Sequence, residues 1–414
     1  MNLWIRASRN DHAVVERLCA PASAGLWQAQ RLPMQGLVAD ANVAAEREQL
    51  REVAAAAGIP FAVDPLTPLF QDVQAPDHAW ASLPFASPER HTPANFGHAE
   101  VQDELIERVI NFQRNAGATV LIPPYFYAGK RGDGWMTLNI QLLARTKHYL
   151  ESHGIDLPVA PVFAASLLEY GPQSAWHEGI DAFVRTTHDM NVQFVALSWS
   201  VSSPGSEGYS KLAHLLSATR HASAQHPVLA WRQGLYGLAL SAVGATGYET
   251  GAGQAERCHY PEFAANRRPV ADDAEKDGSG PRGNAFVYFS AFGRSVPRRV
   301  GAALLANPQL RGSLVCSDDL TCCRDGANSM VGKWREHAIR ARARELRDLA
   351  QMPSKIAWRL NSVARDAERS VATVRLANDV LAEAGERQRL PEDTFRGLVQ
   401  VADELRSQVA EEVA

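Results

Sequence analysis

The feature that most constrains this chain is an alternation of short apolar runs with longer amphipathic stretches. Most runs are continuously apolar, which is typical of parallel strands buried on both faces. Strands that alternate with helices predict a parallel α/β fold. The runs cover residues 3–6, 36–39, 60–63, 118–122, 158–163, 193–198, 227–231, 245–249, 286–289 and 313–316.

Helices are expected between these runs, at residues 44–57, 99–116 and 138–153. Each stretch is followed by a glycine (Gly58, Gly117 and Gly154), the common stop signal after a last helical residue. No G-x-G-x-x-G turn follows an early strand, so we expect a (β/α)8 barrel in preference to an open doubly wound sheet. Ten runs exceed the eight strands of such a barrel, so at least two of them are misread or lie outside it.

The chain has 414 residues, which suits one barrel with an appendage. We expect the barrel in residues 1–330 and a helical C-terminal extension in residues 331–414. Helix-like stretches cover 334–349, 353–384 and 391–413, and Pro353 and Pro391 stand where two of them begin. The charged, Gly/Pro-rich stretch 266–284 is expected to be a surface loop.

The composition excludes several classes of protein. With 46% hydrophobic residues, 21% charged residues and a net charge of −4, the chain has enough apolar content for a large core and is not broadly polycationic. No uncharged apolar run is long enough to span a membrane. The N-terminus does not resemble a signal peptide, so we expect a cytoplasmic protein without a membrane partner. Five cysteines, two of them adjacent, make a poor disulfide framework and favour metal ligands or free thiols.

Polar and aromatic residues follow several of the predicted strands. In a β/α barrel the C-terminal strand ends converge on the site of chemistry. Asp64 and Glu249 end two of the runs, and a pair of carboxylates is the usual requirement for breaking a glycosidic bond. The other candidates at strand ends, for contact with a flat substrate such as a nucleobase, are Tyr125, Ser198, Trp199, Trp231, Gln233 and Tyr248. The alternative is that Asp64 caps the next helix and the aromatic residues belong to the core.

A cysteine cluster precedes the C-terminal helices. Cys316, Cys322 and Cys323 are followed by His337, and zinc sites use three or four thiolate or imidazole ligands. Adjacent cysteines seldom both bind one ion comfortably, so one of the pair can be a bystander. The pair 258–259 (Cys-His) is an alternative source of ligands, and unliganded thiols are a third interpretation.

The stretch 333–347 carries six basic residues. On a helix Arg340, Arg344 and Arg347 share one face, which suits contact with a phosphate backbone. The alternative is a solvated helix in which interleaved acidic residues pair with these arginines.

These segments together resemble the tRNA-guanine transglycosylases and their DNA-acting relatives. Residues 231–249 are similar to the family's glycine turn, short helix and strand ending in a nucleophilic aspartate, which implies that Glu249 is the nucleophile. Residues 61–71 resemble the family's Asp-Ser-Gly-Gly-Phe-Gln segment, without its serine and glycines. This match implies that Asp64 is the acid/base and that Phe70 and Gln71 contact the base. Residues 316–345 resemble the family's zinc knuckle, although the usual Cys-x-Cys-x-x-Cys spacing is absent.

The resemblance implies a (β/α)8 barrel with a zinc-knuckle-like insertion and a structural Zn²⁺. It implies a transferase that exchanges or removes a (7-deaza)guanine-type base on a nucleic acid, either tRNA or DNA, and a homodimer is a possible assembly. Two other classes stay open. One is a catalytically degenerate barrel that serves as a binding or assembly component, and the other is a small-molecule barrel hydrolase.

Overall fold

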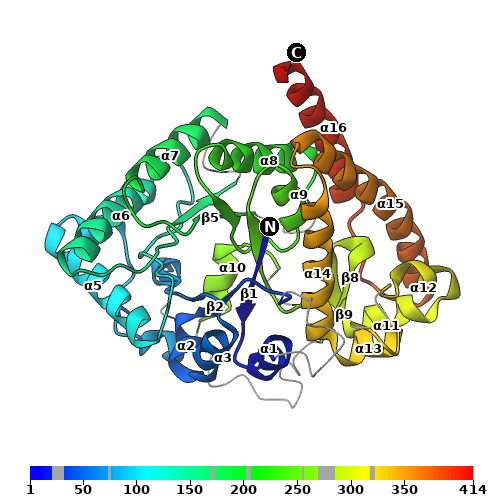
Figure 1. Cartoon of the computed structure of the whole chain (residues 1–414), viewed down its shortest axis with the longest axis horizontal. Coiled ribbons are helices and arrows are strands. Elements are labelled where there is room, and N and C mark those ends of the chain that lie inside the picture. Colours follow the sequence, from blue (N-terminus) through cyan, green and yellow to red (C-terminus); the bar gives the residue numbers. More distant parts are fainter. Residues whose placement is uncertain are drawn as a thin grey trace.

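The computed structural model describes residues 1–20, 32–72, 76–167, 169, 173–201, 207–253, 256–268, 285–317 and 322–413, with side chains described as far as residue 409. A ring of strands lies at the centre and is surrounded by helices (Figure 1). Of the predicted surface loop 266–284, residues 269–284 lie outside the described part. Within the described residues, no helix is both long and apolar enough to cross a membrane.

Seven parallel strands form one sheet in the order β3-β2-β1-β7-β6-β5-β4. Neighbours in this order are neighbours in the chain, except that β1 pairs with β7. The strands are β1 (Asn2–Ala7), β2 (Gly36–Asp40), β3 (Phe61–Asp64), β4 (Val162–Ser166), β5 (Val195–Ser200), β6 (Val228–Ala230) and β7 (Gly247–Gly251).

An eighth segment closes the ring between β3 and β4. Val120 forms a parallel bridge with Ala62 of β3, and Leu121 forms one with Val159, just before β4. The run 118–122 therefore occupies the position of a fourth barrel strand, although it pairs only through isolated bridges. The predicted (β/α)8 fold is confirmed, because all eight segments follow one another around a closed ring in chain order.

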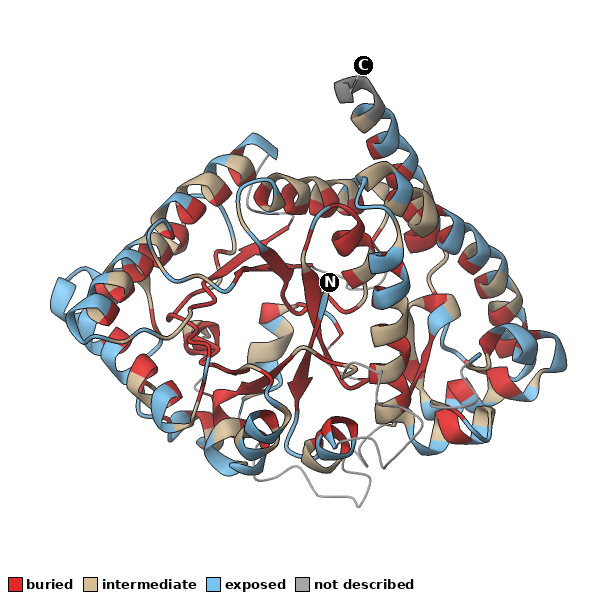
Figure 2. Ribbon diagram, viewed as in Figure 1, coloured by how far each residue is buried: buried red, intermediate tan, exposed pale blue. Residues whose placement is uncertain are grey.

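Helices cover the outside of the ring and turn their buried faces toward it (Figure 2). Every residue of β2 to β7 is buried, as expected for strands that are covered on both faces. The predicted stops after α3, α5 and α6 are confirmed, since Gly58, Gly117 and Gly154 all adopt positive φ. The helices up to β7 are α1 (His12–Cys19), α2 (Ala41–Glu46), α3 (Gln49–Ala57), α4 (His78–Ala81), α5 (Ala99–Asn115), α6 (Trp135–Ser152), α7 (Gln173–Thr186), α8 (Tyr209–Ser223) and α9 (Gly237–Ala242).

The described residues also form three short 3-10 turns and a short helix after β7. The turns are η1 (Thr67–Gln71), η2 (Pro93–Phe96) and η3 (Ser290–Phe292). The helix α10 (Tyr260–Ala265) follows β7 and lies inside the ring of helices instead of outside it (Figure 1).

Two of the ten predicted strands are not barrel strands. The run 286–289 forms β8 (Phe286–Phe289), which pairs antiparallel with β9 (Arg294–Pro297) in a separate hairpin. The strand predicted at 313–316 is wrong, because residues up to Leu314 belong to α12 (Pro308–Leu314). The side chain of Asn307 accepts hydrogen bonds from the amides of Gln309 and Leu310, and Pro308 stands at the first helical position. The cap and the proline favour a helix that starts at residue 308. This helix continues into the apolar residues that, taken alone, favour a strand.

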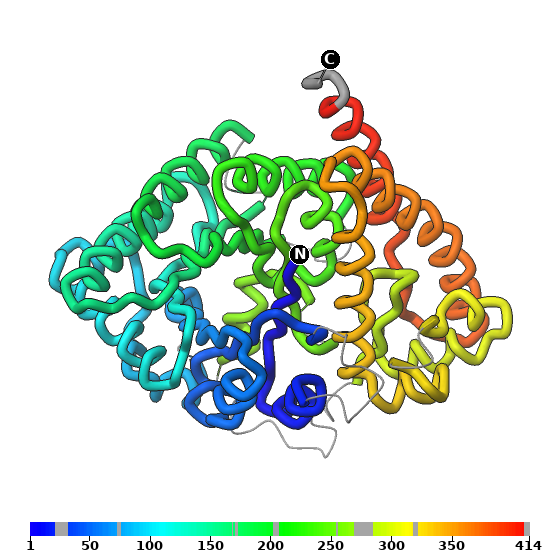
Figure 3. Tube along the Cα trace, viewed as in Figure 1, coloured from blue at the N-terminus to red at the C-terminus, as the bar shows by residue number. Residues whose placement is uncertain are grey.

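The region after the hairpin is helical; the helices predicted at 334–349, 353–384 and 391–413 are found, whereas the helices that precede them were not predicted. It contains α11 (Arg298–Ala306), α13 (Ala327–Gly332), α14 (Trp334–Gln351), α15 (Ile356–Glu383) and α16 (Asp393–Val413). Helix α14 packs against β1 and β8, while α15 and α16 pack on each other and against α9 and α8. The tube in Figure 3 shows this C-terminal pair along one side of the barrel. The division into a barrel at 1–330 and an extension at 331–414 stays a prediction.

A buried arginine ties α14 to the barrel. Arg342 is 1% exposed, donates from Nη1 to the carbonyl of Gly234 at 2.7 Å and pairs with Glu256. Its guanidinium also lies 4.2 Å from the ring centroid of Tyr288.

Replacing Arg342 with alanine is expected to lower the free energy of unfolding by about 3 kcal/mol, because the Glu256 carboxylate would stay buried without its partner. Chemical unfolding monitored by fluorescence measures this change. The exposed Arg347 on the same helix provides the control, and Arg347→Ala should stay within about 0.5 kcal/mol of the parent protein. Equal effects of the two substitutions would contradict the role assigned to Arg342.

Candidate active site

Five charged side chains meet at the C-terminal ends of the barrel strands. Arg6 comes from β1, Asp40 from β2, Asp64 from β3, Arg232 from the turn after β6 and Glu249 from β7. All five are buried, and Asp64 and Glu249 are 0% exposed. Burying a charge is costly unless the charge is paired and hydrogen-bonded. The fold must therefore supply a partner for each of these five side chains.

Arg6 lies at the centre of the cluster. Its Nε donates to Glu249 Oε1 at 2.8 Å, and its Nη2 donates to Glu249 Oε2 at 3.2 Å. Its Nη1 pairs with Asp64 Oδ2 at 3.0 Å and with Asp40 Oδ1. One guanidinium therefore holds the ends of β2, β3 and β7 together through three carboxylates.

Arg232 approaches the same carboxylates from the other side. Its Nη2 lies 2.9 Å from Asp40 Oδ1 and 3.2 Å from Asp64 Oδ2, and its backbone amide donates to Glu249 Oε2 at 2.8 Å. The residue has a φ of 58°, a left-handed conformation that is costly for a residue with a side chain. The hydrogen bonds of both the amide and the guanidinium to the carboxylates offset this strain.

The charges of the cluster nearly balance, with three carboxylates against two guanidinium groups. Burial opposes the ionisation of Asp40, but Arg232, Arg6 and Arg267 outweigh it and lower the pKa of Asp40 to about 2. Burial likewise opposes the charge of Arg6, but Glu249, Asp40 and Asp64 outweigh it and raise the pKa of Arg6 well above its usual value. Asp40 is therefore a carboxylate, and Arg6 a cation, at neutral pH.

A cavity of about 620 Å³ opens above the cluster. Of the three carboxylates only Asp40 is among its lining residues, together with the guanidinium groups of Arg6 and Arg232. The lining is of mixed charge: besides Arg6, Arg232 and Asp40 it includes four further arginines, three further acidic residues and two aromatic residues, namely Arg9, Arg257, Arg267, Arg335, Asp11, Asp77, Glu262, Phe263 and Trp334. The volume of the cavity lies in the range of small-molecule sites, and the excess of arginines over acidic residues suits an anionic ligand.

Of the predicted strand-end residues, Tyr125 contacts Asp64 directly, whereas Ser198, Trp231 and Gln233 are buried and contact neighbouring groups; all four are absent from the lining of the cavity. Tyr125 donates from its hydroxyl to Asp64 Oδ1 at 2.9 Å, and the amide of Leu66 donates to the same oxygen at 2.9 Å. The indole of Trp231 lies 5.1 Å from the guanidinium of Arg6. Ser198 lies 2.8 Å from the hydroxyl of Tyr260, and Gln233 is 1% exposed and donates to the carbonyl of Trp199 at 2.7 Å.

The prediction that Trp199 and Tyr248 frame a substrate is wrong. The ring of Trp199 lies 5.2 Å from Phe163 and 5.9 Å from Trp176 of α7, in the layer between sheet and helices. Tyr248 packs against Gly237 of α9, where an added Cβ would come within 2.2 Å of its ring. Successive strand residues point to opposite faces, so a barrel that turns Ser198 and Glu249 inward turns Trp199 and Tyr248 outward.

Phe70 and Gln71 build the loop after β3 and are absent from the lining of the cavity. The ring of Phe70 packs edge-on against Phe85 at 6.2 Å and against His91 at 5.7 Å. Gln71 exchanges two hydrogen bonds with the backbone of Tyr127, at 2.9 and 2.7 Å. Their predicted contact with a base therefore has no support in this geometry.

Sequence reasoning missed Arg6, Asp40 and Arg232. A signal for the first two was present, because both stand at the ends of predicted strands, where the barrel places its chemistry. Arg232 stands next to the predicted substrate residue Trp231. Only the folded chain shows that these residues surround the predicted pair Asp64 and Glu249.

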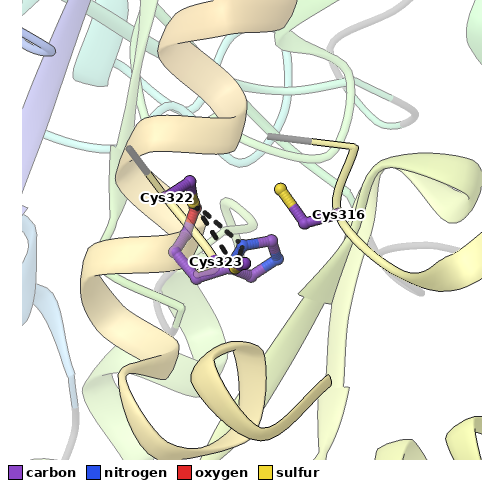
Figure 4. Close-up of side chains that lie close together, drawn as sticks. Cys316, Cys322 and Cys323 are labelled. Atoms are coloured by element: carbon purple, nitrogen blue, oxygen red, sulfur yellow. Dashed lines mark hydrogen bonds between the residues drawn. The ribbon is translucent and has the colours of Figure 1, made fainter. Parts of the chain in front are cut away.

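The three cysteines and the histidine of the predicted metal site come together beside the β8–β9 hairpin. The ligand atoms of Cys316, Cys322, Cys323 and His337 all lie within 4.8 Å of one another (Figure 4). The sulfur atoms of Cys322 and Cys323 are 3.7 Å apart, and each lies 3.3 Å from Nδ1 of His337. A tetrahedron with metal–sulfur distances of about 2.3 Å has sulfur–sulfur edges of about 3.8 Å, so this cluster fits a tetrahedral ion.

Two neighbouring groups orient or stabilise the possible metal ligands. Nε2 of His337 lies 2.8 Å from the carbonyl of Tyr288, which leaves Nδ1 as the ligand atom. Arg344 donates from Nη1 to the sulfur of Cys316 at 3.4 Å and offsets part of the thiolate charge. The alternative pair 258–259 is not part of this cluster, since Cys258 lies 3.3 Å from Ser198 at the barrel mouth.

The predicted basic face of α14 is divided among different surroundings. Arg344 is half-buried at the cysteine cluster, Arg340 is half-buried and Arg347 is exposed. Contact of these three residues with nucleic acid stays a prediction.

No protein-family model matches the chain, and no curated protein sequence matches it significantly. A crystal structure of a putative dihydrodipicolinate synthase family protein from Coccidioides immitis is 15% identical, with a TM-score of 0.30, over 99% of this chain and 96% of that one. A mutant O-GlcNAc hydrolase from Thermobaculum terrenum is 10% identical, with a TM-score of 0.35, over 100% of this chain and 96% of that one. At these TM-scores neither likeness carries an argument, and the barrel assignment rests on the strand pairing of the chain itself.

Elemental analysis of purified protein is expected to find about one bound metal ion per chain. The double variant Cys323→Ala/His337→Ala should lose this ion, because two of the four ligands are gone, and it should unfold at a lower temperature than the parent protein. Cys19→Ala is the matched control, since this cysteine lies in α1 outside the cluster. Freshly prepared parent protein without metal would contradict the assignment.

Proposed function

We propose that this chain is a barrel enzyme that breaks the glycosidic bond of a nucleotide in a nucleic acid and exchanges or removes a (7-deaza)guanine-type base. The observation that carries the proposal is the carboxylate cluster of Asp40, Asp64 and Glu249 beneath an arginine-rich cavity at the C-terminal ends of the strands. Barrel enzymes carry their chemistry at this end, and paired carboxylates suit a glycosidic carbon that develops positive charge.

Glu249 is the proposed nucleophile. An oxygen of its carboxylate attacks the C1′ carbon, the bond from C1′ to the base breaks, and the base departs with the electron pair. An incoming base or water then displaces the carboxylate, which restores Glu249. Arg6 binds both oxygens of Glu249 and orients them, and the amide of Arg232 is a second donor to Oε2. Oε1 accepts only from Arg6 Nε, so it is the oxygen that keeps a further lone pair for the attack.

Asp64 is the proposed partner for the proton of the exchanging base. It lies between Arg6 and Arg232 and accepts a hydrogen bond from Tyr125, so its position is set from three directions. Asp40 faces the cavity and holds both arginines, which makes it a positioning residue. The arginines of the cavity rim suit phosphate groups on either side of the reacting nucleotide.

The proposed ion in the Cys316, Cys322, Cys323 and His337 cluster is Zn²⁺. Three thiolates and one imidazole are a usual ligand set of structural zinc, and four protein ligands leave no open position for a substrate. The ion would join the loop after α12 to α14, so its contribution is to stability.

A second candidate function, a binding component without transfer chemistry, is favoured by one observation. Glu249 and Asp64 are 0% exposed, and their oxygens are occupied by Arg6, Arg232 and Tyr125. A barrel that only binds would keep such a cluster for its structure alone.

Incorporation of labelled guanine into bulk tRNA or into genomic DNA tests the first proposal, together with trapping of a covalent adduct between enzyme and nucleic acid. Glu249→Gln is expected to abolish both signals while folding and metal content stay unchanged, because the amide is a far weaker nucleophile. Asp40→Asn is expected to slow incorporation about tenfold, which corresponds to roughly 1.4 kcal/mol of transition-state stabilisation.

Glu104→Gln is the control, since Glu104 forms an exposed ion pair with Arg108 within α5, outside the lining of the cavity. Its activity should equal that of the parent protein. Absence of incorporation and adduct with both polymers, in folded and metal-loaded protein, would favour the binding component. Full activity of Glu249→Gln would remove Glu249 as the nucleophile.

A further inference from the structure

Helix α10 and its flanking residues cross the mouth of the barrel. At one end, the carbonyl of Cys258 accepts from the amide of Val201 at 3.2 Å, just after β5, and the amide of Tyr260 donates to Ser200 at 3.2 Å. At the other end, Arg267 and Arg268 reach the β2 and β3 side. The segment 256–268 therefore spans the opening from one side to the other, which agrees with the central place of α10 in Figure 1.

This segment covers the inner part of the charge cluster. The hydroxyl of Tyr260 lies 2.8 Å from Ser198, and the ring of Tyr260 stacks on Tyr127 at 5.1 Å. The ring of Phe263 lies 4.8 Å from the guanidinium of Arg232. With these aromatic groups in place, Glu249 has no exposed surface and is absent from the lining of the cavity. A substrate in the cavity cannot touch it in this arrangement.

The two ends of the segment are held with unequal strength. Glu256, at the start, is buried and pairs with Arg342, and it accepts a hydrogen bond from the amide of Ser295 at 3.0 Å. Removing one partner of such a buried pair is strongly destabilising, so this end is firmly anchored.

The far end is held by contacts nearer to solvent. Arg268 binds Asp72 at 2.7 and 3.0 Å with 40% of its side chain exposed, and Arg267 lies 3.8 Å from Asp40 with 33% exposed. One backbone hydrogen bond, from the amide of Asp77 to the carbonyl of Arg267, adds to them. In both pairs the arginine is open to solvent although Asp72 and Asp40 are only 10% and 11% exposed, whereas Arg342 and Glu256 are 1% and 8% exposed. Ion pairs that are open to solvent are weaker and are screened by salt, so this end detaches more readily than the other.

We infer that residues 256–268 form a lid that pivots at Glu256 and releases its Arg267–Arg268 end to admit substrate to Glu249 and Asp64. The purpose of the lid rests on the proposed function, since it matters only if those carboxylates react. Closure over the bound nucleotide would exclude water from the cluster and strengthen its electrostatic interactions. An anionic polymer that competes for Arg267 and Arg268 would favour the open form.

Cys258 provides a direct measure of lid opening. Cys258 belongs to the segment itself, and its thiol is 0% exposed and lies 3.3 Å from Ser198 of β5. Burial also raises its pKa to about 12, so it reacts with a thiol reagent only after the segment moves away from β5. Cys19 is buried in α1, away from the barrel mouth, and serves as the reference thiol in the same molecule. Peptide-resolved mass spectrometry of a time course with a small alkylating reagent gives both rates.

The double variant Arg267→Ala/Arg268→Ala is expected to label at Cys258 about tenfold faster than the parent protein, because two ion pairs of the closed form are lost. Raising the salt concentration should also increase the labelling rate of Cys258 in the parent protein. Arg9→Ala, which removes an exposed ion pair elsewhere on the cavity rim, should leave the rate unchanged.

An unchanged rate at Cys258 in the double variant overturns the lid. A parallel rise at Cys19 overturns it too, because the whole chain is then unfolding. The labelling requires no catalytic activity, so the two proposals can fail separately. If Cys258 labels faster in the double variant but the protein exchanges no base, the lid proposal is supported and the proposed function is contradicted.

Discussion

The structure depends most on one buried guanidinium. Arg6 binds Asp40, Asp64 and Glu249, and so joins the first, second, third and last strands of the ring at one point. Each carboxylate would be costly in the interior without it, and Arg6 would be equally costly without them. Arg232, in the turn after β6, supplies the second positive charge to Asp40 and Asp64. Its backbone adopts a left-handed conformation in this position. The same contacts that close the barrel therefore also concentrate three carboxylates at its mouth.

The C-terminal helices complete this barrel through polar contacts as well as apolar packing. Arg342 of α14 reaches the Gly234 carbonyl and Glu256, and His337 of the same helix contacts the carbonyl of Tyr288 in β8. The cysteine cluster lies at the same junction, where a loop, a hairpin and a long helix meet. A metal ion there would fix the position of α14, and α14 in turn anchors the start of the segment that covers the carboxylates.

Burial and chemistry make opposite demands at this site. A low-dielectric surrounding strengthens the attraction between Arg6 and Glu249 and holds them in one geometry, but it also keeps substrate away from them. A covering segment that is firmly held at one end and weakly held at the other satisfies both demands at different times. The basic rim of the cavity lies beside the weak end, so an anionic ligand and the lid compete for the same arginines.

The sequence by itself determined the kind of fold and much of the site. Continuously apolar runs, glycine stops and prolines near helix starts act locally, so the barrel strands, the helix ends at Gly58 and Gly154, and the C-terminal helices could be predicted from neighbouring residues alone. The cysteine cluster could be predicted because its ligands lie close together in the chain.

The tertiary structure decided the features that depend on residues distant in the sequence. The inward or outward direction of Trp199 and Tyr248 follows from the pleat of strands that are aligned by their neighbours. The convergence of Arg6, Asp40 and Arg232 on Asp64 and Glu249 requires the ring to close, which brings residues more than two hundred positions apart into hydrogen-bonding contact.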